Sequence, residues 1–322
     1  MTDFTAEILS NERWYGDGVP FWHLGRPRSH KSSFAAAEQR QQWVKVLRRH
    51  GKGNASALAL AVKLDACGPG HRCRSAACPE CHRAYQRWFV TACYDLLELG
   101  RGSTRWKAVS VTPPQAKIRQ GGLKGDLFQG VSKALTQGFD EANIAFAVGG
   151  FDISFNEHQQ RAFKPHWKPH AWVFMQCEAF ERGEGRLRAT MPKTNTTPRP
   201  VYARDFDGHR AGLAYALKID FKRRVSLPRV SSGNGAARSR RNTRERELRA
   251  VDKLELLLAL DRAGLEARVY LRGARIKQSP TGPVIKRTAL PFLISRHKPR
   301  QPVKAVTGRN ATQGMLAQTP AP

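Results

Sequence analysis

The sequence predicts a mixed α+β protein in which helices pack on an antiparallel sheet and a small cysteine-rich module precedes that sheet. Segments with alternating apolar residues, typical of strands, are interleaved with segments whose apolar residues recur every three to four positions, typical of helices. The 322 residues are 40% hydrophobic, which is enough to bury a sizeable core.

The expected elements of the main sheet follow one another between the cysteines and a basic stretch. They are a strand over 106–114, a helix over 125–144, strands over 146–155 and 166–180, a loop through Pro200 and a helix over 205–224. We expect His170 on an inner strand and the helices on one face of the sheet.

Composition divides the chain into six parts. We expect an N-terminal extension at 1–60, a cysteine knuckle with its helix at 61–103, the main domain at 104–224, a basic linker at 225–250, a small basic α+β segment at 251–295 and a disordered tail at 296–322.

The balance of charge points to a polyanionic partner. The chain has 55 Lys and Arg against 26 Asp and Glu, a formal net charge of +29. Such a charge repels itself in the compact state unless a polyanion neutralises it, and nucleic acid is the first candidate. No apolar run approaches the roughly 18–20 residues that span a bilayer, and the N-terminus does not resemble a signal peptide. We therefore expect a cytoplasmic protein that acts without a membrane.

The sequence DACGPGHRCRSAACPECH gathers six potential metal ligands within sixteen residues. Clustered thiols in a reducing compartment more often hold a metal than form disulfides, and a Cys-x-x-Cys knuckle presents two thiolates to one tetrahedral zinc ion. We choose Cys67, Cys73, Cys78 and Cys81 as the ligands, with His71 or His82 as alternates. Four protein ligands leave no open position for a substrate, so the zinc would be structural. The remaining cysteines, Cys93 and Cys177, lie in apolar patterns and are expected in the core.

Tyr215 and Lys218 stand three residues apart on the predicted helix over 205–224, so their side chains would share one face. A tyrosine hydroxyl, with a reference pKa near 10, is a poor nucleophile unless a cation stabilises its oxyanion. Lys218 could do so, or it could hold a phosphate together with Lys222, Arg223 and Arg224, which the phosphate backbone of DNA would contact. Taken alone, the pair could equally be an interfacial tyrosine beside a surface lysine.

Taken together and in order, the cysteine knuckle, WKAVSVTPP, KPHAWVFM and YALK resemble the rolling-circle replication initiators of the HUH endonuclease superfamily, over roughly residues 67–224. This resemblance implies a ferredoxin-like arrangement of the sheet and a metal-dependent single-strand DNA endonuclease and strand transferase. Such an enzyme would start rolling-circle replication of a plasmid, phage or mobile element by forming a 5′-phosphotyrosyl link and a free 3′-hydroxyl. Origin DNA, in single-stranded form, and a host helicase would be its partners.

The resemblance assigns roles to individual residues. Tyr215 would be the nucleophile with Lys218 beside it, while His170 and Asp152 would bind Mg²⁺ or Mn²⁺. The family motif has a second histidine two residues after the first, where this chain has Trp172, which could stack on an unpaired base or fill the core. His166 lies about 13 Å from His170 on an extended strand, too far to share an ion unless the segment between them bends.

Three functions are compatible with these residues. The first is active nicking and joining of DNA. The second is a Rep-like zinc protein that has lost this chemistry and binds DNA as a regulator or accessory factor. The third is a zinc-stabilised RNA- or ribosome-binding protein whose likeness to initiators is accidental.

Overall fold

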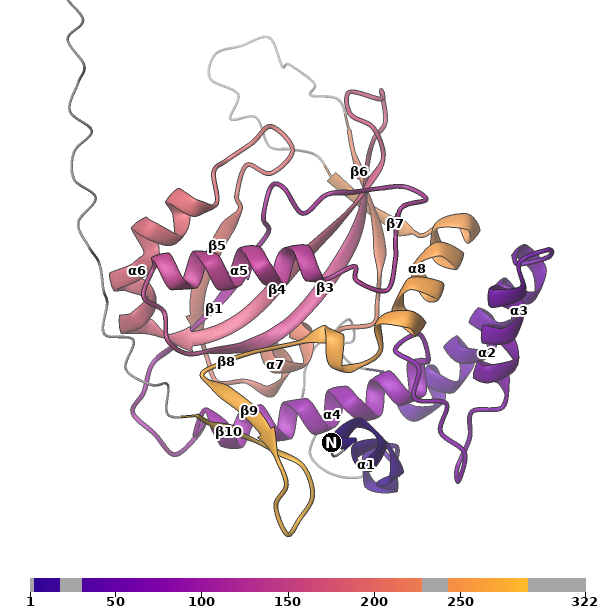
Figure 1. The fold of residues 1–322 in the computed structure, drawn as a ribbon, viewed down its shortest axis with the longest axis horizontal. Helices are drawn as coiled ribbons and strands as arrows, with labels where there is room; N and C mark the ends of the chain where they lie inside the picture. The colour runs from indigo at the N-terminus through magenta and orange to yellow at the C-terminus, as the bar shows by residue number, and fades with distance from the viewer. Residues whose placement is uncertain (1–2, 18–30, 228–242, 289–322) are drawn as a thin grey trace, which may run out of the picture. The chain divides into compact units, whose positions relative to one another are not determined.

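The computed structural model describes residues 3–17, 31–227 and 243–288. These residues form a mixed α+β unit around a curled, mainly antiparallel sheet, whose main path runs in the order β5-β1-β4-β3-β6-β7 (Figure 1). Only β3 and β6 pair in parallel along this path. Its strands are β1 (Trp106–Val111), β3 (Ala147–His158), β4 (His166–Gln176), β5 (Val201–Phe206), β6 (Lys222–Ser226) and β7 (Thr243–Glu247). His170 therefore lies on an inner strand, as predicted.

Two helices connect strands of this sheet. Helix α5 (Gln129–Glu141) joins β1 to β3, and α6 (Cys177–Thr190) joins β4 to β5. The two helices pack against each other, and α5 lies across one face of the sheet in Figure 1. The expected strand over 166–180 ends at Gln176, and the expected loop through Pro200 contains α6. Glycines and charged residues weaken the local helix signal of α6, but Phe180 and Leu187 are buried on its inner side.

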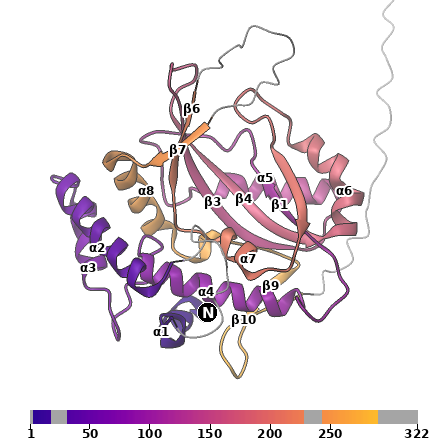
Figure 2. The same cartoon turned by 180° about the vertical axis from the view of Figure 1, so that it is seen from behind.

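Helices cover both faces of the sheet, so the prediction of helices on one face was wrong. Helix α7 (Arg210–Ala216) packs on the face opposite α5 (Figure 2), and α4 (Pro79–Leu96) packs against α7. The close approach of α7 depends on Gly150, because a Cβ there would collide with the carbonyl oxygen of Ala216.

The predicted helix over 205–224 is shortened to the seven residues of α7. Asp205 belongs to β5, where it pairs with β1, and Lys222 begins β6, where it pairs with Glu247 of β7. Pairing with distant strands thus overrides a local pattern that reads as one helix. Lys218 lies beyond the helix, in the turn that leads to β6.

The chain ends add helices and strands around this sheet. Before the sheet come α1 (Phe4–Ser10), the 3₁₀ turn η1 (Glu12–Trp14), α2 (Ser33–His50) and α3 (Ala55–Asp65), and after it α8 (Ala250–Ala263), the 3₁₀ turn η3 (Glu266–Arg268), β8 (Val269–Arg272), β9 (Ala274–Lys277) and β10 (Val284–Arg287). Strand β8 pairs with β3, and the short β2 (Ile118–Arg119) pairs with β4. The segment predicted at 251–295 therefore contributes a strand to the main sheet.

Four predicted regions lie partly or wholly outside the described residues: 1–2 and 18–30 of the N-terminal extension, 228–242 of the basic linker, 289–295 of the small basic segment and the whole tail at 296–322. Residues Thr243–Glu247, expected within the linker, form strand β7 instead. Among the described residues, no helix combines the length and the apolar character that crossing a membrane requires.

Candidate active site and metal centre

The four cysteines chosen from the sequence meet in one buried cluster. All their sulfur atoms lie within 4.8 Å of one another, and the Cys67–Cys81, Cys67–Cys78 and Cys73–Cys81 pairs are 3.6, 3.6 and 3.7 Å apart. Sulfur atoms at the corners of a tetrahedron, each about 2.3 Å from a zinc ion, lie about 3.8 Å apart. Cys78 caps the N-terminus of α4, whose dipole favours thiolates. The cluster could therefore hold a structural metal such as zinc.

Neither alternate ligand belongs to this cluster. His71 is exposed, whereas His82 is fully buried with Nε2 2.5 Å from the carbonyl oxygen of Leu217. Burial and the neighbouring Arg268 lower the pKa of His82 to about 3, so its ring is neutral at pH 7. Cys93 and Cys177 are buried free cysteines outside the cluster.

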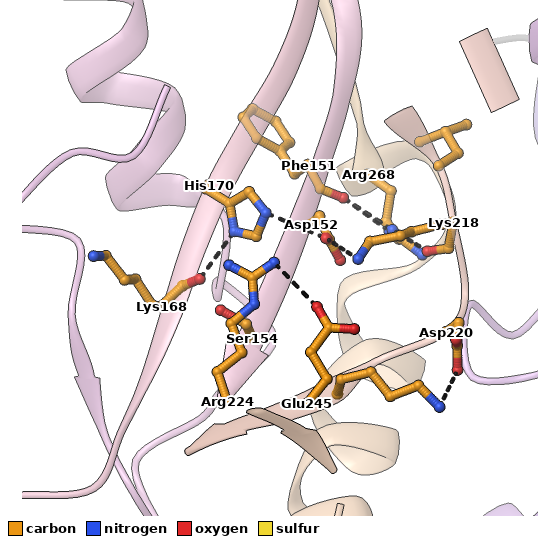
Figure 3. A network of polar contacts seen from close by, with 12 residues as sticks. Phe151, Asp152, Ser154, Lys168, His170, Lys218, Asp220, Arg224, Glu245 and Arg268 are labelled. Atoms are coloured by element: carbon orange, nitrogen blue, oxygen red, sulfur yellow. Dashed lines mark hydrogen bonds and ion pairs between the residues drawn. The ribbon is translucent and has the colours of Figure 1, made fainter. Parts of the chain in front are cut away.

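A second polar cluster lies on the sheet face that α7 covers. Asp152 and His170 are direct partners in the β3–β4 register, so both side chains project from that face. His170 Nε2 lies 3.2 Å from Asp152 Oδ2, and Lys218 Nζ lies 3.0 Å from the same oxygen (Figure 3). Two neighbouring strands and a distant turn thus meet around one carboxylate, whose side chain is only 3% exposed.

The charges of this cluster are mutually stabilised. Burial by itself raises the pKa of Asp152, but Lys218 and His170 lower this pKa by a larger amount. The net pKa of Asp152 therefore lies well below its usual range. Burial alone would lower the pKa of Lys218, yet the Asp152 carboxylate and Tyr215 raise it above its usual value. At neutral pH the site therefore holds a carboxylate and an ammonium in contact.

Tyr215 and Trp172 form the aromatic side of the same cluster. Their rings meet edge to face with centroids 5.1 Å apart, and Lys218 Nζ lies 5.1 Å from the centroid of the Tyr215 ring. Trp172 is 8% exposed and also packs under the guanidinium of Arg204, 5.1 Å from the ring centroid. The structure therefore brings Tyr215, Lys218 and Asp152 together with Trp172, where the indole contributes packing to the core.

Buried donors that the sequence did not reveal hold the turn carrying Lys218. Arg268, which is fully buried, donates to the carbonyl oxygens of Phe151 and Lys218, both at 2.9 Å. His82 donates to Leu217, and Gln86 donates to the carbonyl oxygen of Ala214 at 2.7 Å. His82 and Gln86 are four residues apart on α4 and therefore lie on the same face of that helix. Two polar residues at this spacing within an otherwise apolar helix face were the sequence signal that could have predicted these buried donors.

The remaining predicted residues lie elsewhere. His166 pairs in register with Asn156, four residues along β4 from His170, and it does not join the cluster around Asp152. The three cations of β6 face acidic partners on neighbouring strands: Lys222 pairs with Glu247, Arg223 with Glu157 at 2.6 Å and Arg224 with Glu245 at 3.8 Å.

Asp152 and His170 carry a carboxylate and an imidazole, two groups that bind divalent metal ions in proteins. His170 Nδ1 lies 3.2 Å from the carbonyl oxygen of Lys168, and Nε2 of the same ring lies 3.2 Å from Asp152 Oδ2. Asp152 Oδ1 is buried and has no hydrogen-bond partner among the described residues. Mg²⁺ and Mn²⁺ accept such incomplete protein shells because water and phosphate oxygens supply the other ligands.

Comparisons with models of protein families, with curated proteins and with solved structures found no match for this chain.

Proposed function

We propose that this chain nicks and rejoins single-stranded DNA, with Tyr215 as the nucleophile, to start rolling-circle replication of a plasmid, phage or mobile element in the cytoplasm. The observation that carries the proposal is the meeting of Tyr215, Lys218, Asp152 and His170 at one place on the sheet. The order β1-α5-β3-β4-α6-β5, with the strands arranged β5-β1-β4-β3, supports it because ferredoxin-like sheets share this arrangement.

The proposed chemistry is a transfer of one phosphodiester to the protein. The Tyr215 oxygen forms a bond to phosphorus while the bond to the 3′-oxygen breaks, which leaves a 5′-phosphotyrosyl link and a 3′-hydroxyl. The phenol loses a proton and the departing 3′-oxygen gains one. Lys218, oriented by Asp152, is near enough to the phenol ring to stabilise negative charge on the phenolate or the phosphate. The reverse reaction rejoins the strand.

Two metals belong to this proposal. Asp152 and His170 would hold Mg²⁺ or Mn²⁺, which when bound would polarise the scissile phosphate. Zn²⁺ is the ion we assign to the cysteine cluster, and its role would be to fix the start of α4. Because α4 carries His82 and Gln86, this module would stabilise the turn that presents Lys218. A host helicase would unwind the duplex from the nick.

The test is covalent capture of DNA. The purified chain is incubated with a labelled pool of single-stranded oligonucleotides and Mn²⁺, and a labelled adduct is sought on a denaturing gel. We expect an adduct with the native chain and none with Tyr215→Phe. Tyr202→Phe is the matched control, since Tyr202 is 48% exposed on β5, and it should retain the adduct.

The second candidate is a DNA-binding regulator without chemistry. Trp172 favours it, because the tryptophan stands where the resemblance requires another metal ligand and it packs in the core. Salt-sensitive binding of DNA with no adduct in Mg²⁺ or Mn²⁺ would select this candidate over the first. A preference for structured RNA over single-stranded DNA would instead select an RNA-binding protein.

A further inference from the structure

A cavity of about 870 Å³ lies beyond the candidate active site, where the β3–β4 hairpin meets strands β6 and β7. Its lining includes Asn156, His166, Lys168 and Arg224. Asn156, His166 and Lys168 alternate on the same strand faces as Asp152 and His170, so the cavity opens on the face that carries the site. The Asn156–His166 pair is four residues from the Asp152–His170 pair, about 13 Å along the strands.

The lining of the cavity includes the aromatic ring of Phe163. Phe163 is partly exposed and meets the rings of His166 and His158 edge to face, with centroids 5.4 and 5.6 Å away. Its ring is thus held in place by two neighbouring rings. Such an exposed aromatic ring is the platform on which single-stranded nucleic acids stack their bases.

His166 contributes an unsatisfied acceptor to the same cavity. Only 8% of the residue is exposed, and its Nε2 is buried without a hydrogen-bond partner among the described residues. Its Nδ1 lies 3.0 Å from the carbonyl oxygen of Lys164, so the ring donates there and Nε2 is left to accept. Burial and the positive charges of Lys117 and Lys168 lower the pKa of His166, so its ring is neutral at pH 7. A buried acceptor without a partner is costly, so a ligand that donates an N–H would be stabilised here.

Cations complete the lining. Lys168 Nζ donates to the carbonyl oxygen of Thr196 at 2.8 Å, which fixes the ammonium at the wall. Arg224 is 3.8 Å from Glu245 and its charge also acts on Lys218, so it lies between the cavity and the active site. Positive groups at this position suit the phosphates that flank a bound base.

We infer that this cavity binds one unpaired nucleobase of single-stranded DNA, stacked on Phe163 with an N–H of its edge donated to His166 Nε2. The inference rests on the proposed function only in taking single-stranded DNA as the ligand, and it requires no cleavage. Every base carries at least one N–H donor on its pairing edge or exocyclic group. The subsite therefore holds a base near the active site without selecting its sequence.

Two probes separate the base from the backbone. Fluorescein-labelled dT15 and a 15-mer of abasic sites carry the same phosphates, and fluorescence anisotropy measures their affinities at fixed salt. We expect Phe163→Ala to weaken binding of dT15 by about tenfold, the effect of losing one stacked base, and to leave the abasic 15-mer unchanged. Phe34→Ala is the matched control, because Phe34 is 69% exposed on α2 and does not line the cavity. Phe163→Leu, which keeps an apolar side chain in place, should weaken dT15 in the same way.

The outcomes distinguish this inference from the proposed function. Equal affinities of native chain and both Phe163 variants for dT15 would overturn the inference, as would equal weakening of both probes or a native chain that binds neither. A native chain that binds dT15 with the expected dependence on Phe163, yet forms no adduct through Tyr215, would support the base subsite and overturn only the nicking proposal.

Discussion

Replacement of Lys218 by methionine should destabilise the protein by about 3 kcal/mol. Lys218 Nζ lies 3.0 Å from Asp152 Oδ2, and the side chains are only 13% and 3% exposed. Removing one partner of a buried ion pair costs about 3–5 kcal/mol, because the remaining charge is left buried. His170 still lies 3.2 Å from the same oxygen and compensates in part, which puts the expected loss at the lower end. The free energy of unfolding would be measured in urea by tryptophan fluorescence at pH 7.

The loss should also depend on pH. In the native chain burial raises the pKa of Asp152, but its charged partners lower that pKa by a larger amount, so the net pKa is lowered. The ion pair therefore stabilises the folded state at pH values above the unfolded carboxyl's pKa of about 3.9, and this stabilisation is lost only at lower pH. In Lys218→Met the lysine no longer lowers the pKa of Asp152, so burial raises that pKa and Asp152 takes up a proton at higher pH. The difference between the two proteins should therefore shrink as pH falls from 7 toward 4. Lys63→Met, which breaks a pair that is 43% exposed at the lysine, should cost less than about 1 kcal/mol. A loss as small for Lys218→Met at pH 7 would refute the buried ion pair.

Three other predictions follow from the structure. The native chain should contain about one zinc ion, measured with a chromogenic chelator, and Cys78→Ser should lose it; full zinc in that variant would contradict the four-cysteine site. Gly150→Ala should lower the free energy of unfolding by about 1–3 kcal/mol, measured by thermal unfolding, and should slow adduct formation, because the added Cβ collides with the carbonyl oxygen of Ala216. In the control Gly130→Ala on α5, the added Cβ meets no atom within 4 Å, so this variant should not be destabilised. Arg224→Gln should reduce the slope of log affinity against log salt for dT15 by about 0.7, and an unchanged slope would exclude a phosphate contact.

Patterns with a short period predicted the parts of the site that lie on regular elements. Alternating apolar residues located β1, β3 and β4, and this located Asp152 and His170 on the strands that bring them together. The spacing of the cysteines likewise identified the four that cluster, because ligands within sixteen residues converge without help from the rest of the fold.

Features that depend on distant partners were not predictable in this way. Arg268 is 117 residues from Phe151, to which it donates, and nothing in its local sequence distinguishes it from the many surface arginines. The bounds of helix α7 and the presence of strand β7 were not predicted for the same reason, since the pairing of β6 with β3 and β7 decides where they begin and end.

In the proposed mechanism, the tryptophan at position 172 makes the site depend more on its buried lysine. A histidine there would add a ligand two residues from the first, on the same strand face. In this chain Trp172 lies opposite Gly150, whose missing side chain admits α7, and its indole packs against Tyr215. The position thus supplies packing that orients the proposed nucleophile. A cation with one ligand fewer is held less tightly. If the proposed cation binds there, the ammonium of Lys218, held by Asp152, would supply the larger share of the positive charge beside the phenol.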